Sequence, residues 1–425
     1  METINYPPKN EWSKLLQRPT IDTISLEQTV NDILVDVQKN GDIALAKYTL
    51  QYDKATIAKL LASEVEFEQA EKLCSQELKA AIQLAKSNIE KFHKAQKEEI
   101  KIIETSDGVN CWRKSVGIEK VGLYIPGGSA PLFSTILMLG IPAKLAGCKE
   151  IILCSPPDKN GNLNPAILYA AKLVGVTKLF KIGGVQAIAA MAYGTESVPK
   201  VYKIFGPGNQ YVTCAKQLVN KNGTAIDMPA GPSELAVIAD ETCVPEFVAA
   251  DLLSQAEHGE DSQVILISTN EKIISKIKLE VYKQLEVLPR KEIAAKALEN
   301  STAFLVKDVS EAIQLINEYA PEHLIIACEN DEVISEQIIN AGSIFLGNYS
   351  CESAGDYASG TNHALPTNGN AKAYSGVSLD SFVKKITMQK ITQEGINKIG
   401  PAIEVMAEAE GLQAHKNAVT IRLKK

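Results

Sequence analysis

The sequence predicts an α/β protein built from two parallel-sheet domains, and three observations support this prediction. With 425 residues, the chain is too long for one ordinary hydrophobic core, so at least two domains are expected. Hydrophobic residues make up 45% of the chain and charged residues 22%, which is typical of a globular protein. After Trp112, short β-prone runs that end in Gly or Pro alternate with helical stretches. This alternation predicts parallel strands covered by helices.

The first long element is an amphipathic helix over residues 64–96. Apolar residues recur there at helical spacing between Lys and Glu, from Phe67 through Ala85 to Ile89. Because the period is that of a helix, we expect one continuous helix with one buried face. His93 lies near its end in the segment FHKAQKEE, and we expect this histidine on the solvated face.

Four β-prone runs follow and predict the strands of a first sheet, at residues 121–128, 150–157, 178–184 and 201–209. Helices are expected between them at residues 164–173 and 185–193. Ligands bind at the carboxyl ends of the strands in such sheets. Residues 121–233 are therefore predicted to form a ligand-binding α/β domain.

A second α/β region begins with a strand at residues 235–238 and a helix at 245–258, which ends before Gly259. More strands are predicted at residues 263–268, 303–308, 323–328 and 342–347. We expect the helix near residue 80 to join this region, so that residues 23–120 and 234–379 form one domain and 121–233 are inserted in it. Both domains are predicted to be incomplete and Rossmann-like.

The two ends of the chain lie outside these domains. Residues 1–22 are predicted to form an N-terminal arm. Residues 380–425 are predicted to be a polar, helical tail, and its last part is too small to bury its own apolar face.

Charge and composition exclude several classes of partner. The net charge of -7 and the lack of a long basic cluster argue against a nucleic acid. No apolar run reaches the ~18 residues that a membrane helix needs. The N-terminal residues do not resemble a secretory signal, and the eight cysteines form no CxxC pair. We therefore expect a cytoplasmic protein with reduced, mostly buried thiols.

Four polar segments contain candidate functional residues. Gln255 and His258 lie three residues apart near a predicted helix end, so both face one side and can bind one metal ion. A surface Gln and a His favoured by the helix dipole are the alternative. Glu322 and His323 are neighbours before an apolar strand. They are either an acid/base pair, which requires the chain to turn, or a polar strand entry.

The other two segments lie nearer the C-terminus. Asp356 and His363 lie in a loop of small residues that suits either a cation or an ordinary Asx turn. Glu410 and His415 lie in the tail, where functional residues make sense only if the tail docks onto a larger body. Otherwise both are solvent-facing helix residues.

A glycine loop, GPGN at residues 206–209, follows a predicted strand and precedes a helix. Its backbone N–H groups and the helix N-terminus could face a pyrophosphate. It is not a GxGxxG fingerprint, and no acidic residue can be assigned to a ribose.

Taken in order, these segments resemble the histidinol dehydrogenase family over nearly the whole chain. The resemblance rests on VGLYIPGGSAPLFSTILM, GPGNQYVTCAK, DMPAGPSE, LLSQAEHG, APEHL, AGDYASGTNHALPT and AEAEGLQAHKNAV. It implies an NAD-dependent enzyme that oxidises L-histidinol through bound L-histidinal to L-histidine. It also implies a homodimer whose C-terminal domain reaches the partner subunit.

The resemblance further implies roles for individual residues. One zinc ion per subunit is held by Gln255, His258, Asp356 and His415, which also contact substrate. His323 is the general base and a substrate contact, and Glu322 activates water. The other substrate contacts are Ser233, His363 and Glu410, whereas Tyr124, Gln186 and Asn209 contact NAD.

Three other functions are alternatives to this interpretation. A zinc-dependent hydrolase would use Glu322 to activate water on the metal. An aldehyde dehydrogenase would need an activated cysteine, and none of the eight has such a setting. A metal-stabilised binding protein would bind zinc without turnover.

Overall fold

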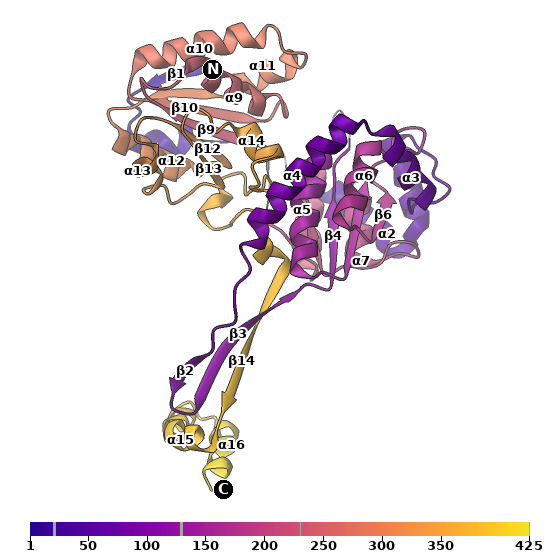
Figure 1. Ribbon diagram of the computed structural model, residues 1–425, viewed down its shortest axis with the longest axis vertical. Coiled ribbons are helices and arrows are strands. Elements are labelled where there is room, and N and C mark those ends of the chain that lie inside the picture. The colour runs from indigo at the N-terminus through magenta and orange to yellow at the C-terminus, as the bar shows by residue number, and fades with distance from the viewer. Residues whose placement is uncertain (20–22, 128–130, 230, 425) are drawn as a thin grey trace.

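The molecule consists of two α/β lobes and a long β-arm that carries two helices at its tip (Figure 1). The computed structural model describes residues 1–19, 23–127, 131–229 and 231–424. The first lobe contains residues 23–94 and 120–226, apart from the gap just given, and the second lobe contains residues 1–18 and 234–357. None of the helices in these described ranges is long and apolar enough to cross a bilayer.

The first lobe is built around a parallel five-stranded sheet with the order β6-β5-β4-β7-β8. Its strands are β4 (Lys120–Tyr124), β5 (Glu150–Ser155), β6 (Lys178–Lys181), β7 (Lys203–Phe205) and β8 (Ala225–Ile226). The connecting helices are α5 (Phe133–Ala146), α6 (Pro165–Val174), α7 (Gly184–Tyr193) and α8 (Gln210–Lys221). This confirms the parallel sheet predicted for residues 121–233.

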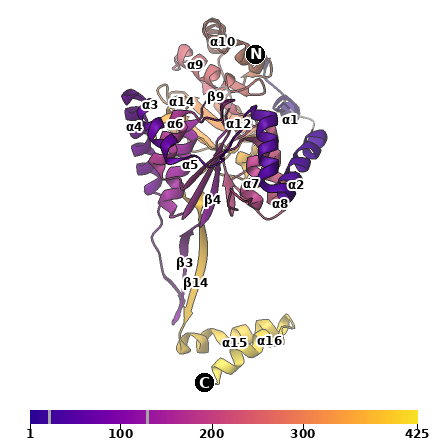
Figure 2. The same ribbon diagram turned by 90° about the vertical axis from the view of Figure 1, so that its right-hand side faces the viewer.

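The N-terminal helices belong to the first lobe, so our assignment of residues 23–120 to the second domain was wrong. These helices are α2 (Thr23–Tyr48), which continues into η2 (Thr49–Asp53), α3 (Glu64–Leu73) and α4 (Gln76–Lys94). α2 packs on α7 and α8, α3 packs on α6, and α4 packs on α5. Figure 2 shows α2, α7 and α8 on one face of the sheet and α3, α4, α5 and α6 on the other. α4 belongs to the first lobe because its side chains Ile82 and Ile89 enter the same hydrophobic core as Ile136 of α5.

The helix predicted over residues 64–96 is two helices. Cys74 is extended, with φ -69° and ψ 129°, and the Ser75 side chain caps α4 by accepting from the Leu78 N–H. His93 was also misplaced by the prediction: it is fully buried, and its ring contacts the side chains of Gln96 and Asn362.

The second lobe contains a parallel six-stranded sheet with the order β1-β11-β10-β9-β12-β13. Its strands are β1 (Glu2–Asn5), β9 (Glu234–Ala239), β10 (Gln263–Ser268), β11 (Thr302–Leu305), β12 (His323–Ala327) and β13 (Ser343–Leu346). The predicted N-terminal arm thus supplies the edge strand β1.

Helices cover both faces of this second sheet. They are η1 (Lys9–Glu11), α1 (Trp12–Leu15), α9 (Pro245–Ala256), α10 (Glu271–Leu285), α11 (Lys291–Glu299), α12 (Val309–Tyr319), α13 (Asp331–Ser335) and α14 (Glu352–Tyr357). Residues of α9, α10 and α11 form the core on one face, and residues of α1 and α12 form the core on the other.

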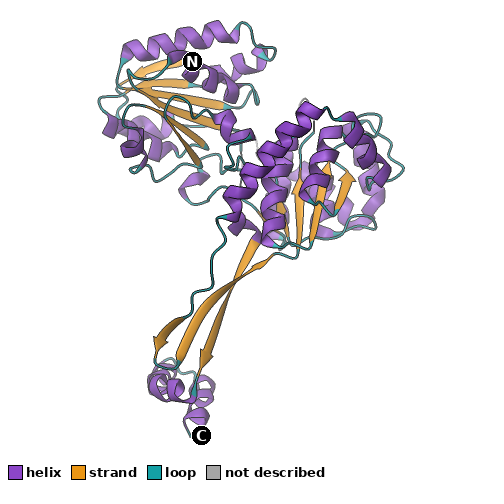
Figure 3. Ribbon diagram, viewed as in Figure 1, coloured by secondary structure: helices purple, strands orange, loops and turns teal. Residues whose placement is uncertain are grey.

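The arm is a three-stranded antiparallel sheet with the order β14-β3-β2. β2 (Ile103–Ser106) and β3 (Val109–Gly117) leave the first lobe, and β14 (Val383–Ile391) follows the short helices η3 (Asn370–Lys372) and η4 (Leu379–Phe382). α15 (Gln393–Ala409) and α16 (Gln413–Leu423) pack together at the tip. Figure 3 shows this change from strand to helix. A helical tail from residue 380 was therefore wrong for β14, which pairs along its whole length with β3.

Candidate active site

The predicted catalytic residues and the predicted substrate contact Ser233 lie at the amino ends of two neighbouring strands of the second lobe. Glu322 directly precedes β12, Ser233 directly precedes β9, and His323 pairs with Leu235 between these strands. In the first lobe the candidate ligand contacts lie at the carboxyl ends instead, where Tyr124 is the last residue of β4. We expected ligands at the carboxyl ends of the parallel strands. This expectation agrees with the position of the candidate contacts in the first lobe but not in the second.

Glu322 and His323 belong to one polar cluster although they are neighbours in sequence. Oε2 of Glu322 lies 3.8 Å from Nδ1 of His323. The chain turns just before them, where Ala320 has a positive φ of 54°. Burial raises the pKa of the Glu322 carboxyl well above its usual value and lowers the pKa of His323 to about 3. His323 is therefore neutral near pH 7.

The hydrogen bond of His323 defines which ring nitrogen can act as a base. Nδ1 lies 3.3 Å from the carbonyl oxygen of Glu234, and because a carbonyl only accepts, Nδ1 carries the proton. Nε2 lies 3.8 Å from Oδ1 of Asp356 and has no hydrogen-bond partner among the described residues. An imidazole with one free, buried nitrogen is suited to accept a proton.

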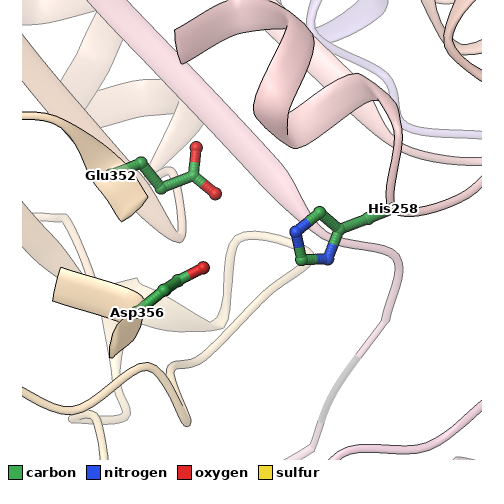
Figure 4. Close-up of side chains that lie close together, drawn as sticks. All are labelled: His258, Glu352 and Asp356. Carbon is green, nitrogen blue, oxygen red and sulfur yellow. The ribbon is translucent and has the colours of Figure 1, made fainter. Parts of the chain in front are cut away.

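His258, Glu352 and Asp356 can hold a metal ion. One ligand atom of each lies within 4.8 Å of the others, and Figure 4 shows both carboxyl groups on the same side of the His258 ring. The two carboxyl residues are four apart on α14, so they share one face of that helix. Oε2 of Glu352 and Oδ1 of Asp356 have no hydrogen-bond partner in the described part of the chain. Nitrogen and oxygen donors of this kind suit zinc, manganese or cobalt.

Two more predicted residues border this cluster. Gln255 is fully buried at the end of α9, and neither atom of its amide has a hydrogen-bond partner among the residues described. His363 donates from Nδ1 to the Asp356 carbonyl at 3.0 Å, so its Nε2 accepts from the Thr135 hydroxyl at 3.0 Å. Thr135 belongs to α5 of the first lobe and Asp356 to α14 of the second, so His363 links the two lobes at the site.

Glu410 and His415 are not brought to this cluster within the chain. Both side chains are exposed on the helices at the tip of the arm, away from α9 and α14 (Figure 1). Of the four predicted ligands, one chain therefore brings His258 and Asp356 together, with the buried Gln255 three residues before His258, and it leaves His415 apart.

A cavity of about 1260 Å³ lies at the carboxyl ends of the first-lobe strands. The three predicted NAD contacts, Tyr124, Gln186 and Asn209, all line it. Gln186 is buried, and both atoms of its amide lack a hydrogen-bond partner within the described ranges. Burial raises the pKa of Tyr124 to about 12, and its hydroxyl accepts from the Gly184 N–H. Pro131, which precedes α5, also lines the cavity, so the cavity and Thr135 meet at the start of one helix.

The GPGN loop is anchored beneath this cavity. Gly206 donates its N–H to Asp227 at 2.8 Å and accepts from Lys216 at 2.8 Å, and Lys216 and Asp227 form a buried ion pair. The side chain of Asn209 caps α8 by accepting from two backbone N–H groups. The loop therefore presents a helix N-terminus to the cavity, as its sequence predicted.

Sequence reasoning missed three charged residues near the site. Glu352 could have been found from its four-residue spacing to Asp356, had a helix been expected there. Asp53 lines the cavity with one buried oxygen that lacks a partner in the described chain, and burial raises its pKa to about 6. Glu234 is the first residue of β9 and directly follows Ser233, and its sequence neighbours give no sign of the contacts that it makes.

Comparison with known proteins agrees with this arrangement. Residues 16–423 match the family model described as histidinol dehydrogenase. The histidinol dehydrogenase of Bacteroides thetaiotaomicron is 64% identical over 423 residues, which cover 100% of this chain and 99% of that protein. The chloroplastic histidinol dehydrogenase of Arabidopsis thaliana is 52% identical, with coverage of 96% and 88%. The crystal structure of histidinol dehydrogenase from Elizabethkingia anophelis has a TM-score of 0.98 and 59% identity and covers 100% of this chain and 98% of that one.

Proposed function

The chain belongs to the histidinol dehydrogenase family, and from this premise we propose how its residues carry out the reaction. It is an NAD-dependent oxidoreductase of histidine biosynthesis that acts on an alcohol. We propose that it oxidises L-histidinol twice, through L-histidinal that stays bound, and releases L-histidine. The observation that carries this proposal is the free Nε2 of His323, which lies beside the potential ligand Asp356.

The residues present fit a zinc ion, one per subunit, bound by Gln255, His258, Asp356 and the His415 of a second copy. The unpartnered buried atoms of Gln255 and Asp356 support this choice, and Glu352 adds a second carboxylate within reach. Zinc bound there would hold the imidazole and amino nitrogens of the substrate and thereby orient its alcohol carbon. Substrate contacts from Ser233, His363 and a second copy's Glu410 would complete the site.

This metal proposal predicts that a chelator abolishes activity and that added zinc restores it, because the predicted ligands include no thiolate. Metal content by mass spectrometry, measured with activity on the same samples, checks the prediction. Full activity in a sample verified to be free of metal would remove the ion from the mechanism.

His323 and Glu322 divide the proton chemistry between them in this proposal. Nε2 of His323 takes the hydroxyl proton of histidinol while a hydride passes to NAD. As water then adds to the aldehyde, Glu322, whose basicity is raised by burial, takes a proton from that water. The protonated His323 returns its proton to the carbonyl oxygen at the same time, so that the hydrate forms and His323 is neutral again. His323 removes the hydroxyl proton of the resulting hydrate as a second hydride passes to a second NAD.

We propose that NAD binds in the first-lobe cavity, against Tyr124, Gln186 and Asn209. The size of the cavity and the helix N-terminus behind the GPGN loop support this placement. A cytoplasmic homodimer is part of the same proposal.

The alternatives are less well supported. Membership of a dehydrogenase family does not favour a zinc hydrolase. A cysteine nucleophile is disfavoured because burial raises the pKa of most thiols, for example to about 11 for Cys148 and Cys243.

The test of the proposed reaction is its stoichiometry. We expect two NADH for each histidinol consumed and no aldehyde in solution, because both groups that the two oxidations require lie in one cluster. NADH absorbance measured against histidinol, with semicarbazide as an aldehyde trap, checks this. A ratio near one together with trapped aldehyde would contradict the two-step proposal.

A further inference from the structure

Glu234 contacts both predicted catalytic residues through its backbone. Its N–H donates to Oε2 of Glu322 at 3.0 Å, and its carbonyl accepts from Nδ1 of His323 at 3.3 Å. The backbone of this one residue therefore sets the direction of the Glu322 carboxyl group and the tautomer of the His323 ring. Any rotation of the backbone at residue 234 changes the orientation of both side chains together.

The carboxyl group of Glu234 lies in the interior of the protein, where the residue is only 1% exposed. A charge in such a place requires a partner, and Arg18 supplies it. Nε of Arg18 lies 2.7 Å from one carboxyl oxygen and Nη2 lies 2.7 Å from the other. Such a two-pronged pair fixes the plane of the carboxyl group as well as its position. The Asn368 N–H adds a further hydrogen bond.

Arg18 is itself held firmly. Its guanidinium lies 4.1 Å from the centre of the Tyr319 ring and donates to the Tyr319 carbonyl at 2.6 Å. Tyr319 is fully buried, and its hydroxyl donates to Gln263 at 2.8 Å. Tyr319 ends α12, immediately before the turn that leads to Glu322. Arg18 thus braces both chain segments that meet at the catalytic pair.

We propose that Arg18, near the N-terminus, is a positioning residue that acts through Glu234 to orient Glu322 and His323. The inference rests on the function proposed for those two residues. Arg18 touches neither of them, so it is not a catalytic residue. Without it, Glu234 would keep a buried, uncompensated carboxyl group and would have to take up a proton or turn toward solvent. In either case Arg18 no longer restrains the side chain of Glu234, and the backbone at residue 234, on which both groups depend, is free to shift.

Arg18→Ala is the decisive variant. We expect kcat to fall about 10- to 100-fold, as for small displacements of reacting groups, while KM for histidinol and the zinc content stay near those of the unaltered enzyme. Oxidation of added histidinal should fall at least as much as oxidation of histidinol, because it needs both groups. Millimolar guanidinium chloride should restore part of kcat, and sodium chloride at equal ionic strength should not.

Lys9→Ala is the matched control, since Lys9 is a cation of the same N-terminal segment that contacts Trp12 and Gln314 and no catalytic residue. It should leave kcat unchanged. Arg18→Lys covers the case in which Arg18→Ala does not fold: it keeps the charge without the two-pronged geometry, and kcat should still fall.

Three results would overturn the proposal: unchanged kcat in Arg18→Ala, a loss that guanidinium does not restore, or unchanged kcat in Arg18→Lys. Glu322→Gln and His323→Ala are run beside these variants. Full activity in both would show instead that the proposed function of the catalytic pair is wrong, whatever Arg18 does.

Discussion

At the scale of single residues, the chemistry of His323 follows from one backbone contact. The Glu234 carbonyl fixes the proton on Nδ1, and burial keeps the ring neutral. The ring is therefore ready to take a proton at Nε2 without first losing one. A histidine exposed to water would lack both properties, since it would rotate freely and be partly protonated near neutral pH.

This division of roles predicts different defects for the two catalytic variants. His323→Ala should slow the oxidation of both histidinol and histidinal by about 100- to 10,000-fold. Glu322→Gln should slow mainly histidinal oxidation, because only that half needs activated water. Single-turnover assays started from each substrate measure the two halves separately. Small, equal losses in both halves for both variants would argue against these roles.

The residues of the site were predictable to the extent that sequence neighbours stay neighbours in space. Gln255 lies in the last turn of α9, and His258 follows just beyond its end, since α9 ends at Ala256 and not at residue 258 as predicted. Glu322 and His323 are adjacent, so local pattern and family resemblance were sufficient to select all four as candidates. Arg18 and Glu234 are 216 positions apart, and only the folded chain brings them together. Glu352 was missed because α14 is a short helix in a segment rich in small residues, where a loop was expected.

At the scale of elements, local periodicity identified strands and helices but not their partners. β10 was predicted with its observed bounds, because a buried parallel strand is a continuous apolar run. The packing of α4 on α5 instead of on the second sheet depends on shape complementarity between distant segments, which periodicity does not encode. β14 has an exposed face and many lysines, so its strand character appears only through its pairing with β3.

In the GPGN loop, close packing against β4 limits which residue can occupy position 206. Gly206 has φ 127°, and a Cβ atom there would lie 2.0 Å from the Tyr124 carbonyl oxygen. We expect Gly206→Ala to destabilise the fold by about 1–3 kcal/mol through strain alone, and to raise KM for NAD because the loop must move away from β4.

Thermal melting and steady-state kinetics at varied NAD check this prediction. Gly223→Ala is the control, because that glycine also has a positive φ but no neighbouring atom within 4 Å of an added Cβ. An unchanged KM for NAD in Gly206→Ala, beside the same loss of stability as the control, would contradict a role for the loop in binding.

At the scale of the whole molecule, the arm holds the C-terminal helices away from their own lobes (Figure 1). Large apolar side chains on them remain exposed, including Val405 at 67% and Met406 at 65%. Such a helix pair is too small to be stable alone and exposes surface suited to a partner. In the proposed homodimer a second copy of the chain would cover this surface and receive Glu410 and His415 at its site, which would explain why these two residues lie apart from the cluster within one chain.

Mixing two inactive variants tests whether the tails cross. His258→Ala removes a ligand of the lobe and His415→Ala removes a ligand of the tail, so each homodimer should be inactive. In a mixed dimer with crossed tails, one site collects both defects and the other combines an intact lobe with an intact tail. That dimer should regain up to about half of the original activity, because one of two equivalent sites is whole. Differently tagged chains allow its isolation for assay. If each tail serves its own chain, every site keeps one defect, and a mixed dimer as inactive as its parents would rule out the shared site.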